Sequence, residues 1–435
     1  MKTRTKLLLD QVVAAPVAWG FNLSARILGA TLHRDHSVVD SEVRCIVVVK
    51  LLGMGSIIQT TPFLRALKQR FPNARLVLLT TAGHRPLVER IEVIDEALYL
   101  DDRTARGLLS GGIRHVLALW KLRPDLYFDL EVYSAATSIL GLLSLARNRY
   151  GFYRTSARFK RGIFTHLVYF NIRMPIARVY LQLHVAAGGD PVDTNELGPI
   201  AIRPADRAAM AVKRLAGGVP ADTRYIVLNP NASDLLLERR WPLDHFAAAM
   251  HMLAERDYHM ILIGAPNEAE HVSAIADALS PLARAKTTNL AGKLSLSELF
   301  ALIADAHCVI TNDTGPMHIA YALNRPTVCL FGPSTPECYG IARDNTEVLY
   351  HQVFCSPCAH ELDQPPCNGN NVCMQLITPA EVVLSVERVV TATGRSHRSL
   401  PVIGQRPIIY VDGVNHGLGV VNRELPDAAR NGRSR

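Results

Sequence analysis

Short apolar runs alternate with segments of helical hydrophobic spacing from about residue 43 onward. The run RCIVVVKLL, which starts at Arg44, is followed by the loop GMGS and then by apolar residues at helical spacing. Further strands are expected in ARLVLLTT from Ala74, in ALYL near residue 97, and in PDLYFDLEVYS, where the strand ends near Glu131. Nearly continuous apolar runs are typical of parallel strands that are buried on both faces of a sheet.

The pattern starts again at Tyr225, where YIVLN precedes a polar turn and the helix WPLDHFAAAMHML. Between about residues 185 and 205 the chain is rich in Gly, Pro and Asp, which is typical of a linker. We therefore predict an α/β protein with two Rossmann-like, doubly wound domains, residues 43–195 and 196–394, that face each other across a cleft. Residues 395–435 are predicted to form a tail with one small strand pair and no assigned function.

Residues 1–42 form a separate N-terminal segment that begins basic and becomes apolar, with Asp10 among the apolar residues. The uninterrupted apolar part is shorter than the about 20 residues that cross a bilayer. One interpretation is an amphipathic helix on the membrane surface, with Trp19 and Phe21 inserted among the lipids. The basic residues expected near lipid phosphates are Lys2, Arg4, Lys6 and Arg26. The alternatives are a helix packed on the protein's own core, a segment for oligomerisation, or a cleaved signal peptide.

The composition adds a preference for anionic partners. The formal net charge is +8, which suits phosphorylated substrates or anionic lipid. Aromatic residues make up only 6% of the chain, and the sequence carries none of the usual nucleic-acid-binding signatures, so we expect no nucleic-acid partner.

The polar turn TNDTGP, which starts at Thr311, lies between the apolar run HCVI and the helix HIAYAL. Open α/β sheets bind ligands at the carboxyl ends of their strands, which is where this turn is predicted to lie. It is therefore the first candidate for a binding site, and an ordinary tight turn is the alternative.

The residues around this turn resemble a known family. The stretch NDTGPMHIAYALNRPTVCLFGPSTP is similar to the signature of glycosyltransferase family 9, the ADP-heptose:lipopolysaccharide heptosyltransferases. RRWPLDHF, LIGAPNEAE and LAGKLSLSEL match the family's pattern in the same order, and the similarity extends from about Val43 to about Val389. The resemblance implies a GT-B fold that binds the acceptor on the first domain and the nucleotide-sugar on the second.

Under this resemblance the turn is a donor site. Amide groups at a helix N-terminus bind anions with the help of the helix dipole, and a glycine lets the backbone approach a diphosphate closely. Proline suits the first helical turn. Asp313 is expected to contact a sugar hydroxyl, which the resemblance favours, or a bound cation, and a helix cap is the structural alternative. The predicted donor residues in the turn are Asp313, Thr314, Gly315, Pro316, Met317 and His318.

Four further residues complete the predicted donor site. The resemblance makes Arg239, just before Trp241, a phosphate-binding cation, and makes Glu268 the acid that holds ribose hydroxyls. Asn231 and Ser233 follow the strand YIVLN and are predicted to bond phosphate oxygens. The structural alternatives are a surface arginine and a glutamate that only stabilises a helix start.

The first-domain loop departs from the family pattern. Many members have Leu-Gly-Asp there, with the aspartate as general base, whereas this chain has Met54, Gly55 and Ser56. A serine hydroxyl orients an acceptor but does not take its proton at neutral pH. We therefore predict that Gly53, Gly55 and Ser56 contact the acceptor.

The general base is predicted to lie at the end of the strand PDLYFDLE. Asp129 and Glu131 are on the same side of this strand and are both expected to face the cleft. Glu131 is the preferred base because it is nearer the carboxyl end, and Asp313 is a second candidate. A helix cap or a salt bridge is the structural alternative.

Cysteines cluster in CSPCAHELDQPPCNGNNVC, at Cys355, Cys358, Cys367 and Cys373. Such clustering in a cytosolic protein favours a metal over disulfides, and four thiolates suit Zn or an iron–sulfur cluster. His360 is an alternative ligand, and disulfides or free thiols remain possible. The site is predicted to be structural, and no metal is expected to be needed for the transfer itself.

Together these observations predict an inverting glycosyltransferase, peripheral on the cytoplasmic face of the inner membrane. It is expected to move heptose or a related sugar from a nucleotide-sugar, ADP-heptose above all, to lipopolysaccharide core or another cell-surface glycan. Because Ser56 replaces the usual acid, a non-catalytic nucleotide-sugar- or glycan-binding protein of the same fold is the alternative. A third possibility is an epimerase-like enzyme that releases free sugar.

Overall fold

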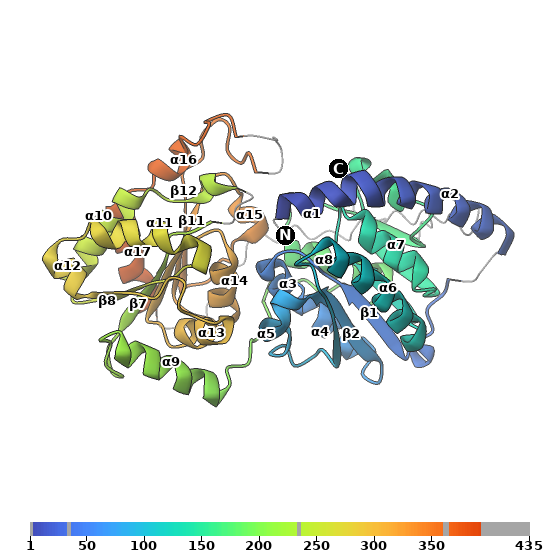
Figure 1. The fold of residues 1–435 in the computed structure, drawn as a ribbon, viewed down its shortest axis with the longest axis horizontal. Coiled ribbons are helices and arrows are strands. Elements are labelled where there is room, and N and C mark those ends of the chain that lie inside the picture. The colour runs from blue at the N-terminus through green and yellow to red at the C-terminus, as the bar shows by residue number, and fades with distance from the viewer. Residues whose placement is uncertain (1–2, 33–35, 233–235, 360–364, 393–435) are drawn as a thin grey trace, which may run out of the picture.

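Two α/β domains lie side by side in the computed structural model (Figure 1). The structure describes the chain except residues 1–2, 33–35, 233–235, 360–364 and 393–435. The predictions for Ser233, His360 and the 395–435 tail therefore lie outside the described residues. Each domain contains one six-stranded sheet, and every pair of neighbouring strands is parallel.

The first sheet has the strand order β3-β2-β1-β4-β5-β6. The expected strands near residues 44, 74, 97 and 126 are all present, and two more follow them. The central strand β1 is buried at every position, as its apolar run predicts. The strands are β1 Cys45–Val49, β2 Arg75–Thr81, β3 Glu96–Leu100, β4 Leu126–Asp129, β5 Asn148–Tyr153 and β6 His166–Tyr169.

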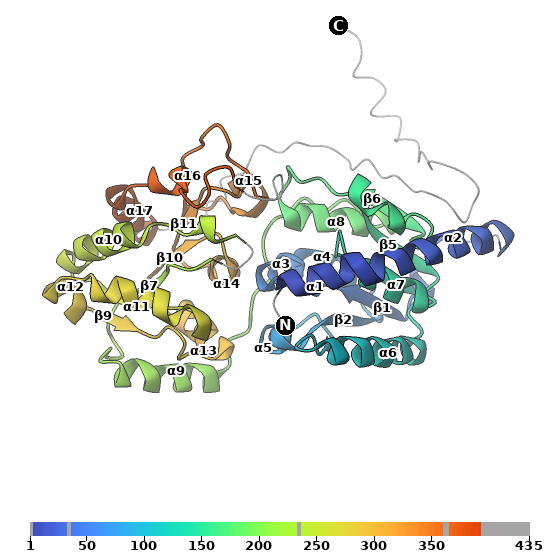
Figure 2. The same ribbon diagram turned by 45° about the horizontal axis from the view of Figure 1, so that its top comes forward.

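The helices of the first domain cover both faces of this sheet. The side that carries α6 and α7 is also covered by a long N-terminal helix, α1–α2, which is continuous through one π-helical turn (Figure 2). The elements are α1 Thr3–Leu9, the π turn η1 Asp10–Ala14, α2 Ala15–Leu32, α3 Met54–Gln59, α4 Thr61–Arg70, α5 Arg85–Val88, α6 Ala105–Leu122, α7 Ala135–Leu143, the 3-10 segment η4 Thr155–Lys160 and α8 Ile176–Ala186.

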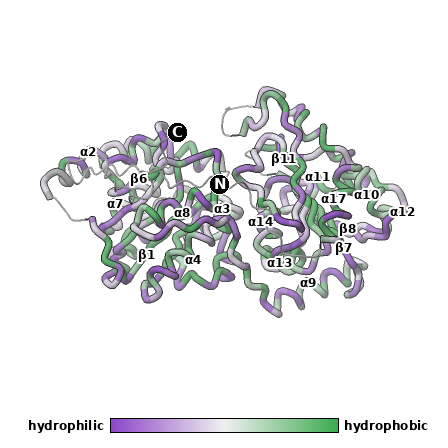
Figure 3. Tube along the Cα trace, turned by 180° about the vertical axis from the view of Figure 1, so that it is seen from behind, coloured by the Kyte–Doolittle hydropathy of each residue, from purple (hydrophilic) through white to green (hydrophobic). Residues whose placement is uncertain are grey.

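The second sheet has the equivalent order β12-β11-β10-β7-β8-β9. Hydrophobic residues gather around its inner strands β7 and β8 (Figure 3). The strands are β7 Tyr225–Asn229, β8 His259–Leu262, β9 Thr287–Asn289, β10 Cys308–Asn312, β11 Thr327–Phe331 and β12 Thr346–Tyr350. The helices are α9 Pro204–Ala216, α10 Leu243–Glu255, α11 Ala269–Asp277, α12 Pro281–Ala285, α13 Leu296–Ala304, α14 Gly315–Ala322, α15 Pro336–Tyr339, α16 Val372–Gln375 and α17 Pro379–Thr391.

The two domains meet through α14 of the second and α3 of the first. The largest buried hydrophobic cluster contains residues of both domains, for example Leu64 on α4 and Ile319 on α14. Arg90 adds a buried polar contact, since its guanidinium binds Asp206 and donates to Ser297 Oγ at 2.9 Å. The chain between α8 and α9 contains residue 195, where the domain change was predicted. That boundary stays a prediction.

Candidate functional site

The predicted donor turn joins β10 to α14 at the carboxyl edge of the second sheet. Buried polar side chains fix its shape. Asn229, at the end of β7, donates from Nδ2 to Thr311 Oγ1 at 3.0 Å and to Thr314 Oγ1 at 2.7 Å. Asn312 donates to the Asn231 carbonyl at 3.1 Å and accepts from the Trp241 amide at 3.3 Å. The turn is therefore held to two neighbouring loops before any ligand binds.

The amides of this turn are not equally available to an anion. Thr314 is the N-cap residue of α14, and Gly315 is the first helical residue. Pro316 has no amide hydrogen, and the Met317 amide already donates to the Thr314 carbonyl at 3.1 Å. The Met317 side chain is fully buried in the core shared by the two domains. Direct ligand contact by Met317, as predicted, is therefore not supported by its position.

Asp313 does not cap the helix, so the structural alternative for this residue does not apply, and its predicted contact with a sugar hydroxyl or a cation stays a prediction. The N-cap of α14 makes no side-chain cap hydrogen bond, and the Asp313 carboxylate lies 3.5 Å from Nη1 of Arg239. The same nitrogen donates to the Asp313 carbonyl at 3.0 Å. Arg239, which was predicted as the phosphate-binding cation, thus offsets the negative charge of the aspartate next to the donor turn.

His318 lies at the contact between the domains. A Cβ placed on Gly55 would be 2.2 Å from His318 Cδ2, so the imidazole packs directly on the glycine backbone. Burial lowers the pKa of His318 to about 4, which leaves the ring neutral at pH 7. Its buried Nδ1 has no hydrogen-bond partner among the described residues. His318 therefore packs against the first-domain loop.

Two further residues of the predicted donor site, Asn231 and Glu268, already make hydrogen bonds within the protein. Asn231 donates from Nδ2 to the Ile263 carbonyl at 2.9 Å, and its buried Oδ1 finds no partner within the described part of the chain. That oxygen suits a donor group of a ligand rather than a phosphate oxygen. Glu268 accepts a hydrogen bond from the Ala265 amide at 2.7 Å, as expected of a glutamate that stabilises a helix start. Burial raises the pKa of its carboxyl.

Arg240 was missed by the sequence argument. It is half-buried, and burial lowers the pKa of the arginine. It follows Arg239 directly and interacts electrostatically with Glu268, the predicted ribose-binding acid. The only sequence signal was the doubled arginine before Trp241, from which one residue had been chosen.

On the first domain, the loop after β1 leads into α3. Gly53 is the N-cap residue of α3 and has a φ of 82°, which favours glycine. Ser56, in the first turn of α3, is half-buried and lies near Tyr180 of α8. Met54 reaches the donor turn, because a Cβ on Gly315 would lie 2.6 Å from Met54 Cε. The predicted acceptor loop thus faces the predicted donor turn.

Glu131 lies directly behind this loop. Its Oε1 accepts hydrogen bonds from Lys50 Nζ at 2.8 Å, from the Leu51 amide at 2.7 Å and from the Leu52 amide at 2.8 Å. Burial alone would raise the pKa of the carboxyl, but Lys50 and the two amides together hold it below its usual value. Glu131 is therefore ionised at neutral pH, as a general base requires.

Asp129 does not face the cleft, so the expectation that both acids would face it is wrong for this residue. Its carboxylate is completely buried and accepts from Lys160 Nζ and Thr137 Oγ1, both at 3.0 Å. It also accepts from the Glu131 amide at 3.0 Å. The strand β4 ends at Asp129, so the strict alternation that was assumed does not continue to Glu131. Asp129 is a structural partner of Lys160.

The four clustered cysteines lie near one another around the loop after β12. Burial and the neighbouring cysteines raise the pKa of the Cys358 thiol, and they raise that of Cys373 to about 11. All eight cysteines of the chain are free thiols in the structure. Among the described residues, no group of three or more His, Cys, Asp or Glu side chains is arranged to hold a metal ion. The site at Cys355, Cys358, Cys367 and Cys373 stays a prediction.

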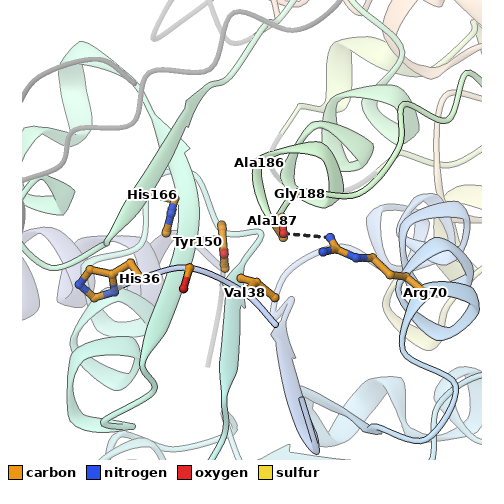
Figure 4. A pocket seen from close by; sticks show the side chains of 9 residues that line it. His36, Val38, Arg70, Tyr150, His166, Ala186, Ala187 and Gly188 are labelled. Atoms are coloured by element: carbon orange, nitrogen blue, oxygen red, sulfur yellow. Dashed lines mark hydrogen bonds between the residues drawn. The ribbon is translucent and has the colours of Figure 1, made fainter. Parts of the chain in front are cut away.

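A small pocket lies on the first domain, and none of the predicted site residues lines it (Figure 4). It has a volume of about 140 Å³ and is lined by polar groups that include His36, Arg70 and His166. Arg70 donates to the Ala187 carbonyl at 2.9 Å and also binds Asp40 at 2.7 Å, so its charge is already paired. The pocket is not part of the candidate site.

Two parallel sheets whose carboxyl-edge loops face each other form a GT-B fold. The model of glycosyltransferase family 9 (heptosyltransferase) matches residues 143–367, just over half of the chain. The chain belongs to this family, and its enzyme class is glycosyltransferase. The predicted fold and family are both confirmed.

Individual relatives agree with this assignment. Lipopolysaccharide heptosyltransferase 2 of Escherichia coli K12 is 40% identical over 99 residues, a match that covers 23% of this chain but only 28% of that protein. Lipopolysaccharide heptosyltransferase 2 of Salmonella typhimurium is 25% identical over 314 residues, 67% of this chain and 84% of that protein. The structure of E. coli ADP-heptose lps heptosyltransferase II has a TM-score of 0.65 at 21% identity and covers 80% of this chain and 98% of that one.

Proposed function

We propose that the protein is an inverting heptosyltransferase that moves heptose, or a closely related sugar, from ADP-heptose to a lipopolysaccharide core or a similar cell-surface glycan. The observation that carries the proposal is the meeting of two loops, because the Thr314–Gly315 turn lies against the Met54–Gly55 loop. A donor bound at the Thr314–Gly315 turn and an acceptor bound at the Met54–Gly55 loop would therefore be next to each other. The names of the heptosyltransferase relatives support the choice of sugar, nucleotide and acceptor class.

The donor diphosphate would bind at the first turn of α14. Because Pro316 lacks an amide hydrogen and the Met317 amide is engaged, Thr314 and Gly315 are the amides proposed to bind phosphate oxygens. Arg239 supplies the positive charge beside them, since it already lies 3.5 Å from Asp313. Amides and a guanidinium together stabilise the charge that develops on the leaving diphosphate, so the proposed transfer uses no metal.

Glu131 is the proposed general base. The acceptor hydroxyl oxygen forms the new bond to the anomeric carbon, and its proton passes to the Glu131 carboxylate. The bond to the diphosphate oxygen breaks, and ADP leaves with the electron pair. Lys50 and the loop amides hold the carboxylate in place through Oε1. Ser56, which lies near Tyr180, is proposed to orient the acceptor hydroxyl.

A transfer assay tests the proposal. Purified protein is incubated with ADP-heptose and lipopolysaccharide from a heptose-deficient strain, and ADP release and product mass are measured. The proposal predicts acceptor-dependent ADP release and an acceptor that gains one heptose unit. Tight ADP binding without transfer to any lipopolysaccharide acceptor would favour the non-catalytic binding protein. Release of free sugar without an acceptor would favour the epimerase-like alternative.

A further inference from the structure

The N-terminal helix α1–α2 is docked on the first domain by polar contacts. Asp10 accepts from Ser134 Oγ at 2.9 Å and from the Ala135 amide at 2.8 Å, so it caps the N-terminus of α7. Asn22 donates to the Phe159 carbonyl at 2.8 Å, and Lys6 pairs with Asp102. Asp10 and Asn22, two polar residues within the apolar pattern of this helix, thus attach the helix to the first domain.

The side chains that face the domain are mostly small. Ala18 belongs to a buried hydrophobic cluster of the first domain, and Ala14 packs against that cluster. Asn22 and Ala25, further along the helix, are also buried. Small residues let the helix backbone come close to α7 and η4. Phe21, which was predicted to insert into lipid, is partly buried in this cluster instead.

The large apolar side chains point the other way. Val12 and Leu23 are each 63% exposed, and Trp19 is 52% exposed. The exposed residues recur at helical spacing and form one stripe, which we call the N-terminal stripe. Its members are Leu8, Val12, Pro16, Trp19, Leu23 and Ile27. A soluble surface does not normally present so many large apolar residues in a row.

A second exposed row lies on α6, on the same side of the sheet. Ile113, Leu117 and Trp120 are one or two turns apart and all exposed. Leu119 of α6 and Ala18 of α2 belong to the same buried cluster, which places the two helices on the same face of the domain. The outer surface of this face therefore has two apolar rows.

Basic side chains accompany both rows. Arg26 is exposed near the end of the N-terminal stripe. Arg158, on η4, and Arg161, directly after it, are also exposed, and α2 contacts η4. Arg114 and Lys121 are exposed beside the row on α6. Large apolar residues with tryptophan and flanking cations match an anionic bilayer surface.

We propose that this face of the first domain is an anionic-lipid docking surface, into which the N-terminal stripe inserts lengthwise. The segment Thr5–Ile27 is long and apolar enough to cross a membrane, by length and composition alone. Crossing would break the contacts of Asp10 and Asn22 with the folded domain and place them in hydrocarbon. Lying on the surface keeps these contacts and buries the stripe.

Vesicle sedimentation with the full-length protein tests this surface. The vesicles are phosphatidylcholine with or without phosphatidylglycerol. Wild type is expected to bind the phosphatidylglycerol vesicles, to bind the neutral ones more weakly, and to be released by an alkaline wash. L23E on α2 and L117E on α6 are expected to weaken binding by about tenfold or more each, because a charge replaces an inserted apolar side chain. The matched control is V212E on α9, a residue that is 69% exposed on the other domain.

Four results would overturn the proposal. These are no binding of wild type to phosphatidylglycerol vesicles, equal loss in V212E and L23E, and protein that resists the alkaline wash as a spanning segment does. The fourth is a wild-type dimer, seen by light scattering, that L23E dissociates without changing vesicle binding. Circular dichroism melting of each variant checks that the fold is intact. Donor hydrolysis and transfer are not read out, so the result is independent of the proposed function.

Discussion

The imidazole of His318, on α14 of the second domain, rests on the backbone of Gly55, at the start of α3 of the first. A Cβ at position 55 would lie 2.2 Å from Cδ2 and 2.9 Å from Nε2 of this ring. The ring is itself confined, because Tyr321 and Tyr339 pack around it with ring centroids 6.2 Å and 6.5 Å away. The absence of a side chain at position 55 therefore determines how closely the donor turn approaches the acceptor loop.

The first prediction follows from this contact. Gly55→Ala is expected to separate the two loops and to lower both stability and transfer, with a loss of about 1–3 kcal/mol in the free energy of unfolding from overpacking. The matched control is Gly112→Ala on α6, where an added Cβ meets nothing within 4 Å. Denaturant unfolding and kcat/KM are measured for both. Equal, small effects of the two substitutions would contradict the close contact.

The second prediction concerns the proposed base. Glu131→Gln is expected to lower kcat by about 10²–10⁴-fold, because the amide cannot take the acceptor proton. Donor affinity should change little, since the residue lies on the first domain. Transfer rate and ADP affinity, the latter by calorimetry, are the measurements. Retention of most of the wild-type kcat would remove Glu131 from this role.

The third prediction concerns Asp129, at the end of β4, where a substitution is expected to change stability rather than catalysis. Asp129→Asn leaves the Lys160 ammonium buried without its carboxylate, so a loss of about 3–5 kcal/mol in stability is expected. The two substitutions should therefore have different main effects. Glu131→Gln should lower the transfer rate, and Asp129→Asn should mainly lower the melting temperature. A normally stable Asp129→Asn variant would contradict the buried pair.

Acid sensitivity is the fourth prediction. Burial lowers the pKa of His318 to about 4 from an unfolded value near 6.5, so the unfolded chain takes up a proton before the native protein does. This contribution to stability is complete above pH 6.5 and is lost as pH falls toward 4. His318→Gln should flatten the slope of melting temperature against pH in that window. An unchanged slope would show that His318 is not buried as a neutral ring.

The fifth prediction tests the cysteine cluster. If the thiols of Cys355, Cys358, Cys367 and Cys373 bind metal, purified protein should contain about one zinc or iron–sulfur centre per chain, as four-thiolate sites do. Elemental analysis and thiol titration measure this. Cys358→Ser and Cys373→Ser should each remove the metal, whereas Cys308→Ser, in the strand β10, should not. Metal-free protein in which all four thiols titrate would contradict the prediction.

The parts that the sequence predicts well are those set by local pattern. The apolar runs of β1 and β10, and the Gly-Pro start of α14, depend on neighbouring residues and are found where expected. The family resemblance rested on the same local motifs. The contact between Gly55 and His318 was not predicted, because it joins residues far apart in the chain.

The features that the sequence did not predict were missed for one physical reason. Asp129 was expected at the cleft because alternation was extended past the end of β4, and the buried Lys160 that holds it lies in a distant segment. Arg239 and Asp313 were both predicted as donor-site residues, but their pairing with each other across the turn was not predicted. Pairings between distant charges leave no periodic signal in a single sequence. Burial and long-range contacts decide them.

A structure of the protein with ADP bound tests the central claim most directly. The account predicts that the diphosphate oxygens lie at hydrogen-bond distance, about 2.7–3.2 Å, from the amides of Thr314 and Gly315, with the Arg239 guanidinium beside them. A diphosphate bound against the first domain near Ser56, with the turn before α14 making no contact to it, would contradict the account.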